Sequence, residues 1–161
     1  MPIALQLALV PGLQYEFLAQ CVRTSVSQAH DAVKRLELAK LAHARTRTVD
    51  GERLENFLYH GVPHAFPPIL GGPATGVPLA VPPLRGRSSL PPADSIVWPC
   101  DGGPAEGMAL MPLYRGAVRL GRTNRRLHEL LVAVDLVRLG RASKHDPDVR
   151  LVIGYALSKA S

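Results

Sequence analysis

Apolar residues recur at helical spacing in three short segments at the start of the chain. The first segment, residues 3–10, ends at Pro11 and Gly12. The second covers residues 15–22, and Ser25 is a favoured N-cap for the third. The apolar positions of the second and third segments are Phe17, Leu18, Val22, Val26, Ala29, Val33 and Leu36. The pattern predicts three helices, the last two joined by a short polar connection around Arg23 and Thr24.

A short strand and a fourth helix are predicted next. Residues 41–48 alternate in polarity and contain Thr and Arg, which favours a strand. Asp50 can cap a helix in which Leu54, Phe57 and Leu58 share one face. Gly61 and Pro63 are expected to end this helix, because neither residue favours a helix interior.

Residues 62–104 hold most of the fifteen prolines and no helical period. Since proline removes a backbone donor, a central strand is not expected there. The interpretation is an ordered, irregular connector. Residues 62–92 should lack helices and long strands, while Leu79, Val81 and Leu84 pack on the domain surface.

The C-terminal part reads as a hairpin followed by helices. Apolar runs on both sides of Cys100, Asp101, Gly102 and Gly103 predict a β-hairpin, and a loop follows it. Asn124 is expected to cap one helix and Asp146 another, with Pro147 in the first turn of the latter. The face of the first of these helices contains Leu127, Leu130, Leu131, Val134 and Val137.

These elements predict an α+β protein that is mainly helical. The expected parts are residues 1–61, an N-terminal helical domain; residues 62–94, the Pro/Gly-rich connector; and residues 95–161, the hairpin with C-terminal helices. A chain of 161 residues that is 47% hydrophobic can bury a core without disulfides. The face at 127–137 suits either a homodimer interface or the core of the protein itself.

Charge and composition narrow the function. The net charge of +6 favours anionic partners, of which nucleic acid is the commonest. Two cysteines do not make a disulfide framework. No stretch has the length and hydropathy of a membrane span, and the N-terminus does not read as a signal peptide, so a cytoplasmic location is expected.

The sequence lacks the common catalytic motifs, including G-x-S-x-G, the P-loop, HExxH and paired-cysteine zinc spacing. His60 and His64 are four residues apart, but Gly61 and Pro63 argue against the helix that would align them as metal ligands. Cys100 and His128 have no feature that marks them as a nucleophile and base. We expect no enzyme activity, no cofactor and no metal.

The second and third helices have the features of a helix-turn-helix. Ala19 is the small residue where two helices cross, and Ala29, Ala32, Val33 and Leu36 form an inner face. The outer face carries short polar and basic side chains suited to base edges and phosphates. Residues 1–61 are therefore the expected helix-turn-helix DNA-binding domain. With two arginines after the third helix, the predicted DNA-binding residues are Ser25, Ser27, Gln28, His30, Lys34, Arg35, Arg45 and Arg47.

The run YEFLAQCVRTSVSQAHDAVKRLELAKL resembles the helix-turn-helix of bacterial winged-helix regulators of the MarR-like kind, over about residues 13–48. The resemblance implies a transcriptional regulator that binds double-stranded DNA, usually as a homodimer on a palindrome. Arg23 stands where such proteins usually have Gly, which predicts a non-glycine residue in a left-handed turn. The wing is expected to be degenerate: a helix beginning at Asp50 is favoured, although Asp50 and Gly51 can also form a tight hairpin.

Two other interpretations remain open. One is a plain helical hairpin without DNA affinity. The other is an accessory or antitoxin-like subunit that uses a degenerate helix-turn-helix to dock a protein partner, which Asp31 on the outer face favours. A second basic group, formed by Arg115, Arg119, Arg122, Arg125 and Arg126, is interpreted as a solvated loop.

Overall fold

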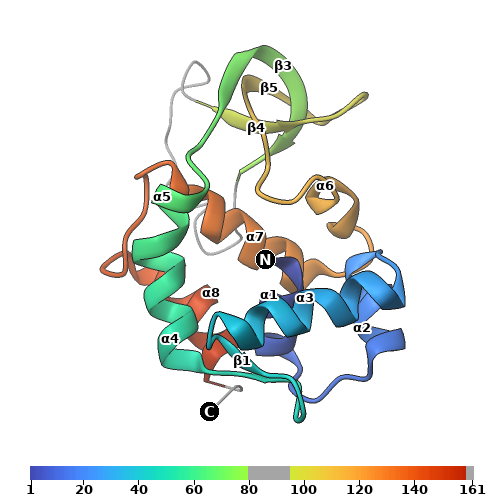
Figure 1. Ribbon diagram of the computed structural model, residues 1–161. Helices are drawn as coiled ribbons and strands as arrows, with labels where there is room; N and C mark the ends of the chain where they lie inside the picture. The colour runs from blue at the N-terminus through green and yellow to red at the C-terminus, as the bar shows by residue number, and fades with distance from the viewer. Residues whose placement is uncertain (80–94, 159–161) are drawn as a thin grey trace.

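The computed structural model describes residues 1–79 and 95–158, and it is an α+β fold, about half helical, with two small sheets (Figure 1). The helices are α1 (Pro2–Leu9), α2 (Tyr15–Val22), α3 (Val26–Leu38), α4 (Gly51–Asn56), the π-helix η1 (Phe57–Gly61), α5 (Val62–Ala65), α6 (Ala117–Leu120), α7 (Arg125–Arg138) and α8 (Pro147–Leu157). The strands are β1 (Ala42–His43), β2 (Thr48–Val49), β3 (Leu70–Pro78), β4 (Ile96–Pro99) and β5 (Ala105–Leu110).

The predicted helix starts are confirmed by their caps. The side chains of Ser25, Asp50, Asn124 and Asp146 each accept a hydrogen bond from a backbone N–H in the first turn of the helix that follows. Such caps satisfy donors that have no partner within the helix. The starts of α3, α4, α7 and α8 are therefore fixed by local sequence.

The core forms around α1 and α7. Every residue from Ile3 to Leu9 is buried, and α1 contacts α2, α3, α7 and α8. The apolar face of α7 lies in the same core: Leu127, Leu130, Leu131, Val134 and Val137 are each at most 5% exposed. This face packs within a single chain and is not available as a dimer interface. Phe17 differs from its prediction, because it points away from the core and is 58% exposed.

The helix that begins after Asp50 does not end at Gly61, so that prediction is wrong. The chain passes from α4 through the π-helix η1 into α5 and ends its helical path at Ala65. Pro63 lies in the first turn of α5, where its missing N–H costs no regular helical bond. The wider π turn absorbs the irregularity at Gly61. His60 and His64 are both exposed on this path, and in the described parts of the chain no group of three His, Cys, Asp or Glu residues is placed to hold a metal.

The expectation that residues 62–92 lack helices and long strands is also wrong, since α5 covers Val62–Ala65 and β3 covers Leu70–Pro78. β3 has 9 residues and pairs with both β4 and β5. It accommodates proline because Pro73 adjoins an irregularity in the pairing with β5, and Pro78 is the last residue. Leu79 packs on the core, whereas Val81 and Leu84 lie outside the described residues.

The two apolar runs around Cys100–Gly103 do not form a hairpin with each other. β4 and β5 are parallel neighbours, with Ile96 opposite Met108, and each runs antiparallel to β3 in a closed three-stranded sheet. The predicted turn exists, with Gly102 at a φ of +67°. The strands on either side of the turn take their antiparallel partner from β3, which explains the error.

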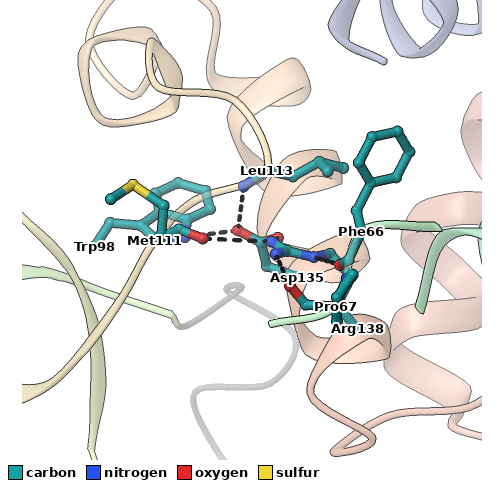
Figure 2. A network of polar contacts seen from close by, with 7 residues as sticks. All are labelled: Phe66, Pro67, Trp98, Met111, Leu113, Asp135 and Arg138. Carbon is teal, nitrogen blue, oxygen red and sulfur yellow. Dashed lines mark hydrogen bonds and ion pairs between the residues drawn. The ribbon is translucent and has the colours of Figure 1, made fainter. Parts of the chain in front are cut away.

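A buried polar network joins the sheet to α7 (Figure 2). Asp135 forms an ion pair with Arg138 and accepts hydrogen bonds from Trp98 Nε1 (2.8 Å) and the Leu113 N–H (3.3 Å). Arg138 also donates to the carbonyl oxygens of Phe66 (2.8 Å) and Pro67 (3.2 Å). Burial raises the pKa of the Asp135 carboxyl, and Arg138 opposes the rise. The network attaches the segments before β3 and after β5 to one helix.

Candidate nucleic-acid interface

The connection between α2 and α3 is a tight left-handed turn at Arg23, which has a φ of 56°. The Thr24 N–H donates to the carbonyl oxygen of Ala19 (2.9 Å), which closes the end of α2. Ala19 is only 3% exposed, as expected for a small residue where two helices approach each other. The predicted non-glycine residue in a left-handed turn is confirmed.

The third helix presents one buried and one exposed face. Ala29 and Val33 are fully buried against the rest of the N-terminal helices. Ser27, Asp31 and Lys34 are all exposed, and their spacing of four and three residues places them along one face. The exposed face therefore combines a basic side chain, an acidic side chain and a short hydroxyl side chain.

A two-stranded hairpin follows α3 directly. Ala42 pairs with Val49 and His43 with Thr48, so the predicted single strand over 41–48 is two short strands with a turn at 44–47. The favoured helix at Asp50 is present, and the alternative hairpin turn at Asp50 and Gly51 is not, because these residues begin α4 and the hairpin turns at 44–47 instead. The Ala44 N–H donates to Glu37 Oε1 (3.2 Å), which holds the turn against α3. In Figure 1 the tip of the hairpin points away from the three-stranded sheet.

Ser25 and Gln28 use their side chains within the helix. Ser25 Oγ accepts from the Gln28 N–H (3.1 Å), and Gln28 Oε1 accepts from the Ser25 N–H (3.3 Å) and from the Thr24 hydroxyl. This capping box satisfies backbone donors at the start of α3. The Gln28 amide N–H groups are the part of the pair that is left for another molecule.

His30 and Arg47 pack against Tyr15. The His30 and Tyr15 rings meet edge to face with centroids 5.0 Å apart, and the Arg47 guanidinium lies 5.6 Å from the Tyr15 centroid. Arg47 Nε also donates to the carbonyl oxygen of Leu13 (2.8 Å). Arg47 thus fastens the hairpin to the α1–α2 loop.

The other four predicted residues are exposed: Ser27, Lys34, Arg35 and Arg45. None of their side chains makes a hydrogen bond or ion pair with another residue that the structure describes. Arg45 lies in the turn of the hairpin, whereas Arg35 lies near the Met1 amino group, whose pKa falls to about 6 through burial and, second, through the Arg35 charge. Lys34 and Arg45 are therefore the freest cations of the predicted set.

Comparisons with protein families, curated proteins and solved structures found no match for this chain. Within the described ranges, no helix is long and apolar enough to cross a membrane.

Part of the second basic group takes a role that the sequence does not indicate. Arg125 pairs with Glu129, and Arg126 lies over the Tyr155 ring. Arg119 and Arg122 instead line a hollow together with Arg23, although roughly a hundred residues separate them along the chain. The loop predicted there contains the short helix α6. Linear spacing carries no signal for this juxtaposition, since it depends on how the sheet packs.

Proposed function

We propose that the protein binds double-stranded DNA sequence-specifically and acts as a transcriptional regulator, with α2 and α3 as a helix-turn-helix and β1–β2 as a short wing. The observation that carries the proposal is the exposed face of α3 followed at once by a hairpin with Arg45 in its turn. An α-helix is about as wide as the major groove, and the 13 residues of α3 span about 20 Å.

The contacts divide into three kinds. Lys34 and Arg45 contact phosphates, which contributes affinity without sequence preference. Ser27 and the free amide of Gln28 reach base edges. Arg47 is a positioning residue, because its guanidinium is held by Leu13 and Tyr15.

Binding is measured by gel shift and fluorescence anisotropy, using the duplex upstream of the protein's own coding sequence and a scrambled duplex of equal composition. Lys34→Ala and Arg45→Ala should weaken binding to both duplexes and reduce the salt slope by about one unit each. Gln28→Ala should weaken binding to the upstream duplex by about 1–3 kcal/mol and to the scrambled duplex far less, the smaller loss coming from the capping contact of Gln28 at the start of α3. Asp31→Asn should tighten binding, because it removes an acid from the phosphate-facing surface.

Lys144→Ala is the matched control, since it removes one exposed charge from the α7–α8 loop. Equal losses in Lys144→Ala and Lys34→Ala would mean that net charge alone drives binding. Unchanged binding in Lys34→Ala and Arg45→Ala would exclude this face as the DNA reader.

The proposal includes a homodimer in the cytoplasm, because one chain offers one reading helix and two copies match a palindrome. Light scattering should then give about twice the chain mass of 17.4 kDa. Since the face of α7 is buried, the interface must lie elsewhere; Leu151 on α8 is 62% exposed. The homodimer proposal would be contradicted if the protein is a strict monomer at micromolar concentration and Leu151→Glu has the same measured mass.

The alternative is a docking subunit that binds a protein partner. One observation favours it: Phe17, Val26 and Leu38 on α2 and α3 are 58%, 44% and 84% exposed. Val26 and Leu38 lie at opposite ends of α3, so Leu38, the most exposed of the three, is the candidate anchor for a partner rather than part of one apolar patch. If no duplex gives a salt-dependent shift, this alternative takes first place, and Leu38→Ser should then abolish partner binding.

A further inference from the structure

A hollow of about 430 Å³ lies where three parts of the chain meet. Arg23 comes from the α2–α3 turn, Asp101 from the β4–β5 turn, and Arg119 and Arg122 from α6 and the segment after it. The volume lies within the range of small-molecule sites. We call it the arginine-lined hollow.

The cations of the arginine-lined hollow exceed its acids. Arg23, Arg119 and Arg122 line it with one acid, Asp101. Within residues 1–79 and 95–158, none of the three guanidinium groups has a hydrogen-bond or ion-pair partner. All three side chains are exposed, so water screens their mutual repulsion, but their shared place in the lining gives the hollow a net positive charge that favours an anion.

The two sides of the arginine-lined hollow are held together by a specific contact. The Tyr114 hydroxyl donates to the carbonyl oxygen of Val22 (2.6 Å), the residue before Arg23. Tyr114 precedes α6, so this bond fixes α6 beside the α2–α3 turn, where Figure 1 shows them close together. The pKa of Tyr114 is raised by burial and lowered in part by Arg23, which places that guanidinium near the phenol.

We propose that the arginine-lined hollow binds a small organic anion through phosphate or carboxylate groups. Guanidinium groups form paired hydrogen bonds with both. Val77 and Val118 give the hollow apolar walls for the body of such a molecule, and Asp101 can accept a hydrogen bond from a hydroxyl or amino group. A concave site with an acid in its lining suits a small ligand better than a duplex, whose phosphates require a cationic surface along a continuous track.

Occupancy would act on α3. Arg23 lies in the turn that sets the direction of α3, so a bound anion links that turn to α6 and the sheet. This regulatory step rests on the proposed DNA binding, whereas anion binding itself does not. The two are therefore measured separately.

The test titrates ¹⁵N-labelled full-length protein with inorganic pyrophosphate and with citrate, at constant ionic strength and without DNA. The arginine Nε–H signals of Arg23, Arg119 and Arg122 should shift along a saturating curve with at least one probe, while Arg150 on α8 should not. Replacing Arg119 and Arg122 with Ala should raise the Kd for that probe about tenfold or more. Arg150→Ala, an exposed residue, should leave the Kd unchanged.

Non-saturating shifts spread over all exposed arginines would overturn the proposal. So would a double variant that binds the probes normally yet loses DNA affinity as Lys34→Ala does, because the arginines would then be a DNA contact. If the protein binds an anion saturably but binds no duplex, the proposed anion site is supported and only its regulatory role is excluded.

Discussion

Asp135→Ala should be among the most destabilising single changes in this protein. The substitution removes the carboxylate that pairs with Arg138 and accepts from Trp98 and Leu113 (Figure 2). The Arg138 side chain is only 5% exposed, so its charge cannot turn into water. It keeps the carbonyls of Phe66 and Pro67 as acceptors but has no negative partner left in the network.

The magnitude follows from what remains buried. An uncompensated buried charge costs about 3–5 kcal/mol. Trp98 Nε1 loses its acceptor as well, and an orphaned buried donor costs about 1–3 kcal/mol. The retained carbonyl bonds and water entering the new cavity reduce the sum, so we expect a loss of about 3–5 kcal/mol. This is a large fraction of the roughly 5–15 kcal/mol by which domains are stable.

Urea unfolding measures the loss, with fluorescence of Trp98, the only tryptophan, and circular dichroism as independent probes. The midpoint should fall by about 2 M for a typical urea dependence. Glu129→Ala is the control on the same helix, because it breaks the ion pair with Arg125, whose side chain is 73% exposed. Such an exposed pair contributes about 0–1 kcal/mol.

A double-mutant cycle isolates the pair. Arg138→Met alone leaves the Asp135 carboxylate buried, so combining it with Asp135→Ala should cost less than the sum of the two, by about 1–3 kcal/mol. If Asp135→Ala costs no more than Glu129→Ala, or if the two losses simply add, the buried network does not stabilise the fold as argued.

Three further substitutions test local features, each by thermal or urea unfolding. Arg23→Gly should stabilise the protein by about 0.5–1 kcal/mol, because glycine adopts the positive φ at lower cost; a loss would mean that the Arg23 side chain holds the turn. Ser25→Ala should lower the free energy of unfolding by about 1 kcal/mol, because α3 loses its cap. Ser27→Ala, two residues further along and inside α3, should lower it far less. Tyr59→Phe should gain about 1 kcal/mol, because the buried Tyr59 hydroxyl has no hydrogen-bond partner in the part of the chain that the structure describes. Burial and, second, the charge of Glu55 raise the pKa of Tyr59 to about 12. The folded state therefore keeps a proton that the unfolded chain releases near the ordinary pKa of 10.0. The free energy of unfolding should fall between pH 10 and 12, and Tyr59→Phe should lessen that fall.

The sequence by itself determined the features that depend on neighbouring residues. Caps at Ser25, Asp50, Asn124 and Asp146 set the helix starts, because each side chain bonds a backbone N–H two or three residues ahead. The left-handed turn at Arg23 was predictable only from the helix-turn-helix resemblance, which places a glycine-like position there. The exposed residues of the candidate site, Ser27 and Lys34, follow from helical periodicity alone.

Tertiary structure decided which apolar faces are buried and which polar side chains are held by contacts within the chain. The apolar stripe of α7 has the same pattern for a dimer interface and for a core, and only packing against α1, α6 and α8 buried it within one chain. Ring packing on Tyr15 and a bond to Leu13 gave His30 and Arg47 structural contacts that no spacing encodes.

The choice of strand partners was also beyond local sequence. Local sequence predicts an antiparallel hairpin of the runs on either side of Gly102, but these runs pair parallel to each other and each pairs antiparallel with β3, a strand that its prolines argue against. A strand lowers its free energy with any partner that satisfies its backbone groups, so pairing depends on which edges the fold brings together. The same long-range packing brought Arg23 beside Arg119 and Arg122, because the Tyr114 bond to Val22 joins segments that the sequence keeps far apart.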